Sequence, residues 1–313
     1  MTLLLALLIG TAQAGDGPWT LNAGEDSLFL GVSTFRYAEF QDSKSGDTSS
    51  LGEGITATGL VGVWTSGLAE GLELELVVPY ERVRVNDRRS SYCMSESRPA
   101  DYCATSSGIG DMSAVLKARV LNELYASPVS MSLAAAARTG ELYSDHRDRL
   151  TTLGDGNTDL GAGLSLGRTD LLGSGWYRVG AWGWYWFRLP HEGDTWATKV
   201  PADEVSYTFE ATWSPHPRVG FGPALQGFHR LGGVPFSEMD FDSENHWSSL
   251  QAAQIQAGGK VGIYTDGGPT FALAVLRTVW AQNNPTDTLV VTAGLGWFWP
   301  EGMPLKRLGG GGG

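Results

Sequence analysis

Long hydrophobic runs and charged residues are scarce in this sequence. Beyond residue 14, no apolar run approaches the roughly 20 residues that a membrane-spanning helix needs. Apolar residues at alternate positions of a strand escape hydropathy averaging, so this scarcity excludes helical membrane proteins only. Charged residues make up 18% of the chain, and the formal net charge is −12. Because an acidic chain repels phosphate groups, we expect no nucleic-acid partner.

Histidine and cysteine are also rare. Of the five histidines, only His229 lies near the end of an expected strand, and no serine motif accompanies it. Neither a nucleophile with its base nor a zinc ligand set is indicated, so we expect no enzymatic activity, no cofactor and no metal. The two cysteines, Cys93 and Cys103, share the longest polar loop. In an exported protein such a local pair indicates a disulfide bond.

What the sequence has in abundance is two-residue alternation. Residues 108–168 contain three runs in which apolar side chains occupy every second position, as in β-strands with one buried face. Each run is about a dozen residues long, roughly twice the usual strand length, which suits a tilted strand crossing a bilayer. Similar runs recur along the chain. The pattern predicts an all-β fold: a transmembrane, antiparallel, up-and-down β-barrel of about 12 strands.

The chain divides into three expected parts. Residues 1–14 read MTLLLALLIGTAQA, an apolar core followed by a small-x-small cleavage site, which is typical of a signal peptide. Residues 15–300 would form the barrel, and residues 301–313 a glycine-rich C-terminal tail. A buried N-terminal strand is the alternative for the first segment.

The expected connections alternate between short turns and long loops. Outer-membrane barrels show short periplasmic turns and long external loops, with both termini in the periplasm. We therefore expect a protein of the Gram-negative outer membrane, surrounded by outer-membrane lipid and inserted by the barrel-assembly machinery. Aromatic residues near strand ends fit interfacial girdles or ordinary strand composition: Tyr37, Tyr80, Tyr125, Trp213, Trp280, Trp297 and Trp299.

If the apolar parity of each strand faces lipid, the opposite parity lines the lumen. In the run WYRVGAWGWYWFR (residues 176–188), two arginines place the even positions inside, although these tryptophans could belong to a girdle instead. The charged side chains could form a substrate path or simply pair and fill the lumen. The expected luminal residues are Lys117, Arg119, Arg138, Arg178, Trp182, Trp184, Trp186, Glu204, Glu210, Arg218 and Arg230.

Two glycine-rich motifs carry a family resemblance. GIGD at residues 108–111 precedes an alternating strand containing Lys117, and GDGNTD at residues 154–159 precedes another strand. This arrangement resembles the outer-membrane transporters of the MetA pathway of phenol degradation, which are distantly similar to long-chain fatty-acid transporters. The resemblance implies passage of small hydrophobic or aromatic molecules.

Two functions remain open from the sequence. The first is a transporter or channel for small hydrophobic or aromatic compounds, supported by the resemblance and by the expected luminal tryptophans. The alternative is a structural or adhesive outer-membrane barrel that transports nothing and has a closed, charge-paired lumen. The two differ in whether a continuous path crosses the barrel.

Overall fold

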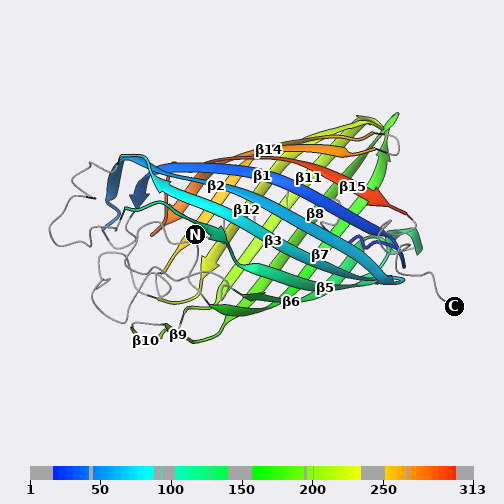
Figure 1. Ribbon diagram of the computed structural model, residues 1–313. Helices are drawn as coiled ribbons and strands as arrows, with labels where there is room; N and C mark the ends of the chain where they lie inside the picture. Colours follow the sequence, from blue (N-terminus) through cyan, green and yellow to red (C-terminus); the bar gives the residue numbers. More distant parts are fainter. Residues whose placement is uncertain are drawn as a thin grey trace, which may run out of the picture.

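Twelve antiparallel strands form a closed β-barrel in this computed structural model (Figure 1). The structure describes residues 17–41, 45–87, 93, 103–125, 127–139, 157–193, 196–199, 201–233, 251–265 and 268–300. The wall strands are β1 (Asp26–Gln41), β2 (Thr48–Ala69), β3 (Leu72–Val85), β5 (Met112–Leu121), β6 (Ser130–Thr139), β7 (Thr158–Leu172), β8 (Gly175–Arg188), β11 (Glu204–His216), β12 (Val219–Arg230), β13 (Ala253–Ile263), β14 (Thr270–Gln282) and β15 (Leu289–Trp299).

The sheet closes because β1 pairs with both β2 and β15, and β2 pairs with β3. Each strand therefore has a hydrogen-bonded neighbour on both sides, which leaves no free edge. The strands run obliquely to the barrel axis, as closure of a sheet requires (Figure 1). The sequence prediction of an all-β, antiparallel barrel of about 12 strands is confirmed.

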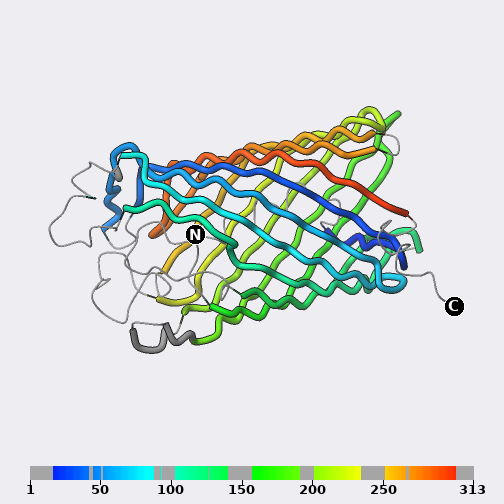
Figure 2. The backbone as a smooth tube through the Cα atoms, viewed as in Figure 1, coloured from blue at the N-terminus to red at the C-terminus, as the bar shows by residue number. Residues whose placement is uncertain are grey.

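Short turns lie at one end of the barrel, which we call the short-turn end. The β2–β3 turn contains Gly71 and the β7–β8 turn contains Gly173, with φ of +74° and +63°, where a side chain would be strained. The wall also begins and ends here, since Asp26 of β1 lies opposite Trp299 of β15. The dark blue start of the described chain lies at this end (Figure 2).

Short elements interrupt or decorate the wall in ways that the alternation did not predict. β4 (Ser106–Ile109) pairs with β3 ahead of β5, and Gly110 N donates to Pro79 O at 3.0 Å where the two strands break. β9 (His191–Gly193) and β10 (Trp196–Lys199) form a small hairpin, and η1 (Glu123–Tyr125) is a 3-10 turn between β5 and β6. The expected signal peptide and C-terminal tail lie outside the described residues. Within the described part of the chain, no helix is long and apolar enough to cross a membrane.

The outward face of the wall is apolar along most strands. Leu133 and Leu164 lie outward on β6 and β7 with 50% and 44% of their surface exposed, while Ser132 and Ser165 beside them are buried inside. Water would solvate such an exterior poorly, whereas hydrocarbon would solvate it well. Other exposed apolar residues are Leu30, Val32, Val78, Leu160, Leu166, Phe187, Phe209, Phe221, Phe271, Leu273 and Val275.

The assumption that apolar parity faces outward is wrong for β2. Val61 and Val63 are 4% and 2% exposed and pack inside the barrel, whereas Leu60 is 54% exposed on the outer face. Register is the cause, because Val61 lies opposite Gly31 on the inward face of β1. Tyr37 is also inside rather than in a girdle: it is 6% exposed and stacks on Phe35 at 6.2 Å between ring centroids.

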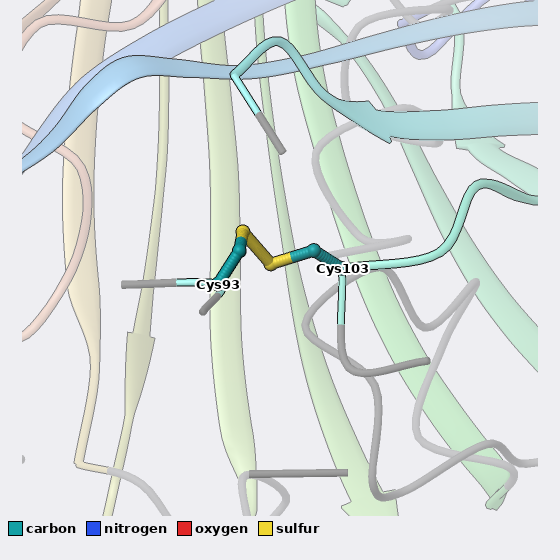
Figure 3. The surroundings of a disulfide bond; sticks show 2 residues. All are labelled: Cys93 and Cys103. Atoms are coloured by element: carbon teal, nitrogen blue, oxygen red, sulfur yellow. A yellow bond between two sulfur atoms is a disulfide. The ribbon is translucent and has the colours of Figure 1, made fainter. Parts of the chain in front are cut away.

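A disulfide bond joins Cys93 to Cys103 in the connection between β3 and β4 (Figure 3). Their Cα atoms lie 5.7 Å apart, and no free cysteine is found among the described residues. The expected pairing of the two cysteines is confirmed.

The orientation of β2 gives a first prediction. A fluorophore on Leu60→Cys should be quenched by nitroxide attached to lipid acyl chains, because this position faces outward. A fluorophore on Val61→Cys should be quenched much less, since the barrel wall separates it from lipid. Fluorescence of the two labelled proteins in nitroxide-containing liposomes is the measurement. Stronger quenching at Val61 would mean that the strand is turned the other way.

Candidate luminal site

The inner face of β8 carries a column of tryptophans. Trp182, Trp184 and Trp186 point inward, and Tyr185 and Phe187 between and beyond them are exposed on the outer face. Strand geometry imposes this separation, because successive side chains of a strand point to opposite faces. We call Trp182, Trp184 and Trp186 the tryptophan column.

Two of these indole rings lie flat on the neighbouring strand β7. Trp184 covers Gly163 and Trp186 covers Gly161, and these are also the residues directly opposite in the register. A Cβ atom on Gly163 would come within 2.8 Å of Trp184 Cε3, and one on Gly161 within 2.7 Å of Trp186 Cζ3. The two rings stack with centroids 5.3 Å apart and an interplanar angle of 22°. Glycine on β7 thus allows broad aromatic rings to lie along the wall.

Charged side chains border the column on the side of the long loops. Asp159 of β7 accepts hydrogen bonds from both Arg138 of β6 and Arg188 of β8, with Arg138 Nε at 2.9 Å and Arg188 Nε at 3.4 Å. The Arg138 guanidinium lies 4.5 Å from the Trp186 ring centroid, a cation–π contact. Trp186 Nε1 donates to Ser206 Oγ at 3.1 Å. Arginine and hydroxyl contacts therefore fix the last indole of the column.

Further ion pairs follow the inner wall. Arg230 Nε lies 3.6 Å from Glu204 Oε2, and Lys117 and Lys260 contact Glu73 and Glu210. Each pair joins strands that are adjacent in the sheet or that have a single strand between them. The charges are thereby held along the wall, and pairing of this kind offsets the cost of their burial.

An apolar cluster lines a different part of the inner wall. Phe29 of β1, Val61 and Val63 of β2 and Val77 of β3 pack together, all with 8% or less of their surface exposed. Ala272 of β14 packs against them. The interior thus combines polar, charged and aromatic side chains with an apolar cluster on β1, β2 and the middle of β3, although β3 also carries buried Glu73 and Glu81.

The other expected luminal residues fall in several places. Arg119 pairs with Glu70 of the β2–β3 turn at 2.7 Å, at the short-turn mouth. Arg178 lies over the ring of Trp19, 4.3 Å from its centroid. The placement of Arg218 in the lumen is wrong, since it is exposed in the turn between β11 and β12. Inward positions hold Lys117, Arg119, Arg138, Arg178, Trp182, Trp184, Trp186, Glu204, Glu210 and Arg230; their role in a substrate path stays a prediction.

Tyr264 lies near charged and aromatic side chains at the short-turn end. Tyr264 follows β13, and its ring packs against Trp176 with centroids 6.5 Å apart. Burial raises the pKa of the Tyr264 hydroxyl above its usual value, and Arg178 nearby opposes this rise.

Among the residues that the structure describes, no group of three or more His, Cys, Asp or Glu side chains is arranged to hold a metal ion.

The sequence interpretation missed the apolar cluster and Trp19. The alternation of β2 pointed to the wrong face, because valines occupy the inward parity while Thr56 and Thr58 lie on the outward one. Only pairing with β1 reveals the orientation. Trp19 precedes the first strand, where periodicity carries no information about its neighbours.

The comparisons with known proteins bear on this architecture. The crystal structure of the COG4313 outer membrane channel from Pseudomonas putida F1 superposes with a TM-score of 0.67 and 14% identity, covering 90% of this chain and 97% of that one. The chain shares the β-barrel fold of this protein. A further match is the β domain of the Bordetella autotransporter BrkA, with a TM-score of 0.48 and 9% identity, covering 87% of this chain and 100% of that one. Another is the translocator domain of the autotransporter NalP from Neisseria meningitidis, with a TM-score of 0.46 and 8% identity, covering 90% of each chain. These two resemble the chain too weakly to support an argument.

No protein-family model matches this sequence, and no curated protein sequence matches it either. Of the sequence resemblance to outer-membrane transporters, the barrel fold is confirmed, because the chain shares it with a solved outer membrane channel. The narrower assignment to the MetA pathway remains a prediction.

Asp159 provides a test of the charged cluster. Asp159→Asn should destabilise the barrel by roughly 3–5 kcal/mol, because it leaves two buried arginines without their shared carboxylate. The matched control is Asp170→Asn, which removes an exposed ion pair with Arg168 and should change the stability little, because solvent screens the pair. Urea unfolding of the refolded proteins in liposomes measures both. Equal loss in the two variants would show that the buried cluster does not stabilise the fold.

Proposed function

We propose that this barrel resides in the bacterial outer membrane, with the short-turn end facing the periplasm. The apolar exterior suits hydrocarbon, and the closed ladder satisfies the wall's backbone hydrogen bonds without water. The first and last wall strands meet at the short-turn end, so this orientation would also place both barrel termini in the periplasm. Outer-membrane lipid and the barrel-assembly machinery would then be its partners.

We further propose that the barrel conducts small hydrophobic or aromatic molecules. The observation that carries this proposal is the tryptophan column, whose flat rings lie along the inner wall over Gly161 and Gly163. A planar cargo could stack on successive rings, each contact contributing roughly 0.5–1.5 kcal/mol beyond simple burial. The apolar cluster around Phe29 and Val61 offers a second surface on which such a molecule avoids water.

The arrangement of charges is compatible with passage. The ion pair of Glu204 with Arg230, like that of Asp159 with Arg138, links adjacent strands of the wall. Pairs that follow the wall neutralise one another without having to reach across the barrel. They would leave the cargo a path beside them and would discourage uptake of small inorganic ions by offering few unpaired charges.

One observation favours the alternative of a non-transporting barrel. Residues 17–25 lie across the short-turn mouth, and Trp19 contacts Arg178 on β8. If this segment never leaves, the barrel is closed and its role is structural or adhesive. The two functions separate experimentally, because only a transporter releases solute from a sealed liposome.

Release of benzenesulfonate from proteoliposomes tests the transport proposal. This permanently charged aromatic solute crosses lipid slowly, and its ultraviolet absorbance in the external buffer reports release. Trp184→Ala should slow release roughly three- to tenfold, because it removes one stacking surface. Trp213→Ala is the matched control: Trp213 is 43% exposed on the outer face, so its loss should leave release unchanged.

Two outcomes would contradict the proposal. Equal rates in the two tryptophan variants would show that the column does not contact cargo. Absence of release from liposomes containing the wild-type protein, at a protein density where refolding is verified by circular dichroism, would favour the closed barrel.

A further inference from the structure

Residues 17–25 cross the short-turn mouth and are held by strands from several parts of the wall. Lys117 Nζ of β5 donates to Gly17 O at 3.3 Å, and Ser132 Oγ of β6 donates to Pro18 O at 2.6 Å. On β3, Glu73 Oε2 accepts a hydrogen bond from Leu21 N at 2.8 Å. Backbone groups of the segment and polar side chains of the wall make these contacts, so they attach the segment without depending on the identity of residue 19.

The Trp19 ring fills a gap in the side chains of β8. Along the inward face of this strand, Gly180 interrupts the series of large residues, and it lies directly opposite Gly167 of β7. A Cβ atom on Gly167 would come within 2.7 Å of Trp19 Cη2, and one on Gly180 would lie 3.7 Å from Trp19 Cζ3. We call this shallow site the Gly167–Gly180 recess. It is the same arrangement that Trp184 and Trp186 make with Gly163 and Gly161, except that the indole comes from the N-terminal segment.

A guanidinium group borders the recess. Arg178 lies 4.3 Å from the Trp19 ring centroid and 5.7 Å from that of Trp176. Its Nε atom is buried without a hydrogen-bond acceptor, and no carboxylate pairs with it among the residues that the structure describes. Glu210 of β11 lies directly opposite Gly180 and also borders the recess, but its carboxylate pairs with Lys260. Among the described residues, Arg178 therefore has no ion-pair partner, whereas Arg138, Arg188 and Arg230 each have a carboxylate partner.

We propose that the Gly167–Gly180 recess with Arg178 is a binding site for a planar aromatic anion, and that Trp19 occupies it as a tethered competitor. This inference rests on the proposed transport of aromatic molecules and names a site on their path. The glycine pair accepts a flat ring, and Arg178 supplies both a cation–π contact and the positive charge that an anionic substituent would neutralise. Trp19 provides only the ring, so that among the described residues this charge keeps no ion-pair partner.

The recess lies where an aromatic molecule would arrive after leaving the tryptophan column towards the short turns. From the long loops to the short turns, the inner face of β8 carries Trp186, Trp184 and Trp182 first, then Gly180, Arg178 and Trp176. A ring passing along the wall would reach the recess next and would exchange with Trp19. The indole N–H of Trp19 donates to Glu123 Oε1 at 3.2 Å, and Glu123 Oε2 accepts from Thr169 N at 2.9 Å, so an entering ring would have to break this hydrogen bond to displace the indole.

Calorimetric titration with benzenesulfonate, on the full chain refolded in detergent, tests the site independently of transport. Trp19→Ala should bind benzenesulfonate roughly tenfold more tightly than the wild type, because the competing ring is gone. Adding Arg178→Ala to this variant should abolish the gain. Trp19→Phe, which retains a ring, should stay near the wild-type affinity.

Two controls address the chemistry of the ligand and of the recess. Cyclohexanesulfonate has the same charge and a ring of similar size without a π-face, and it should gain little from Trp19→Ala. Gly180→Leu should displace Trp19 and also fill the recess, so this variant should bind benzenesulfonate no better than the wild type. Circular dichroism and thermal melting verify folding. If Trp19→Ala does not fold, Arg178→Ala in the otherwise wild-type chain provides the test: it should lose benzenesulfonate binding, and unchanged binding would overturn the inference.

An unchanged affinity in Trp19→Ala, or an equal gain for cyclohexanesulfonate, would overturn the inference. Its failure is distinguishable from failure of the proposed function. Wild-type release of benzenesulfonate with no effect of Trp19→Ala on affinity would refute the recess alone. An affinity gain without any release from proteoliposomes would refute transport and leave the binding site standing.

Discussion

Closure of the hydrogen-bonded sheet is the constraint on which the rest of the structure depends. Because β1 pairs with both β2 and β15, every wall strand has two neighbours and the register of each is fixed by the next. Register in turn decides which residues point inward, since a shift of one position would exchange the two faces of a strand. The luminal chemistry is therefore a property of the whole ring of strands rather than of any one of them.

Glycine gives this interior its space. A barrel wall of large residues on both β7 and β8 would force the indoles of Trp184 and Trp186 away from the wall, whereas Gly163 and Gly161 let them lie flat. The same device recurs at Gly167 and Gly180, where the ring belongs to Trp19. Aromatic rings that lie flat against the wall present their faces to the lumen without narrowing it.

Charge is treated differently in two parts of the interior. Near the long loops, Asp159 neutralises part of the charge of two arginines and ties β6, β7 and β8 together. Near the short turns, Arg178 contacts aromatic rings and no carboxylate among the described residues. A buried cation costs less beside aromatic faces than alone, yet it retains a capacity to attract an anion. This contrast separates a structural cluster from a candidate binding site.

The sequence by itself determined the strand pattern and the closed antiparallel barrel, because two-residue periodicity is a local property. It favoured an inward position for Trp182, Trp184 and Trp186 and left an interfacial girdle open, and the structure places them inside. The sequence also indicated the pairing of Cys93 with Cys103, which requires only proximity along the chain. Only the tertiary structure decided that Val61 and Val63 face inward, that Arg218 lies in a turn, and that Trp19 meets Arg178. These facts depend on cross-strand register and on contacts between residues far apart in the chain, about which periodicity carries no information.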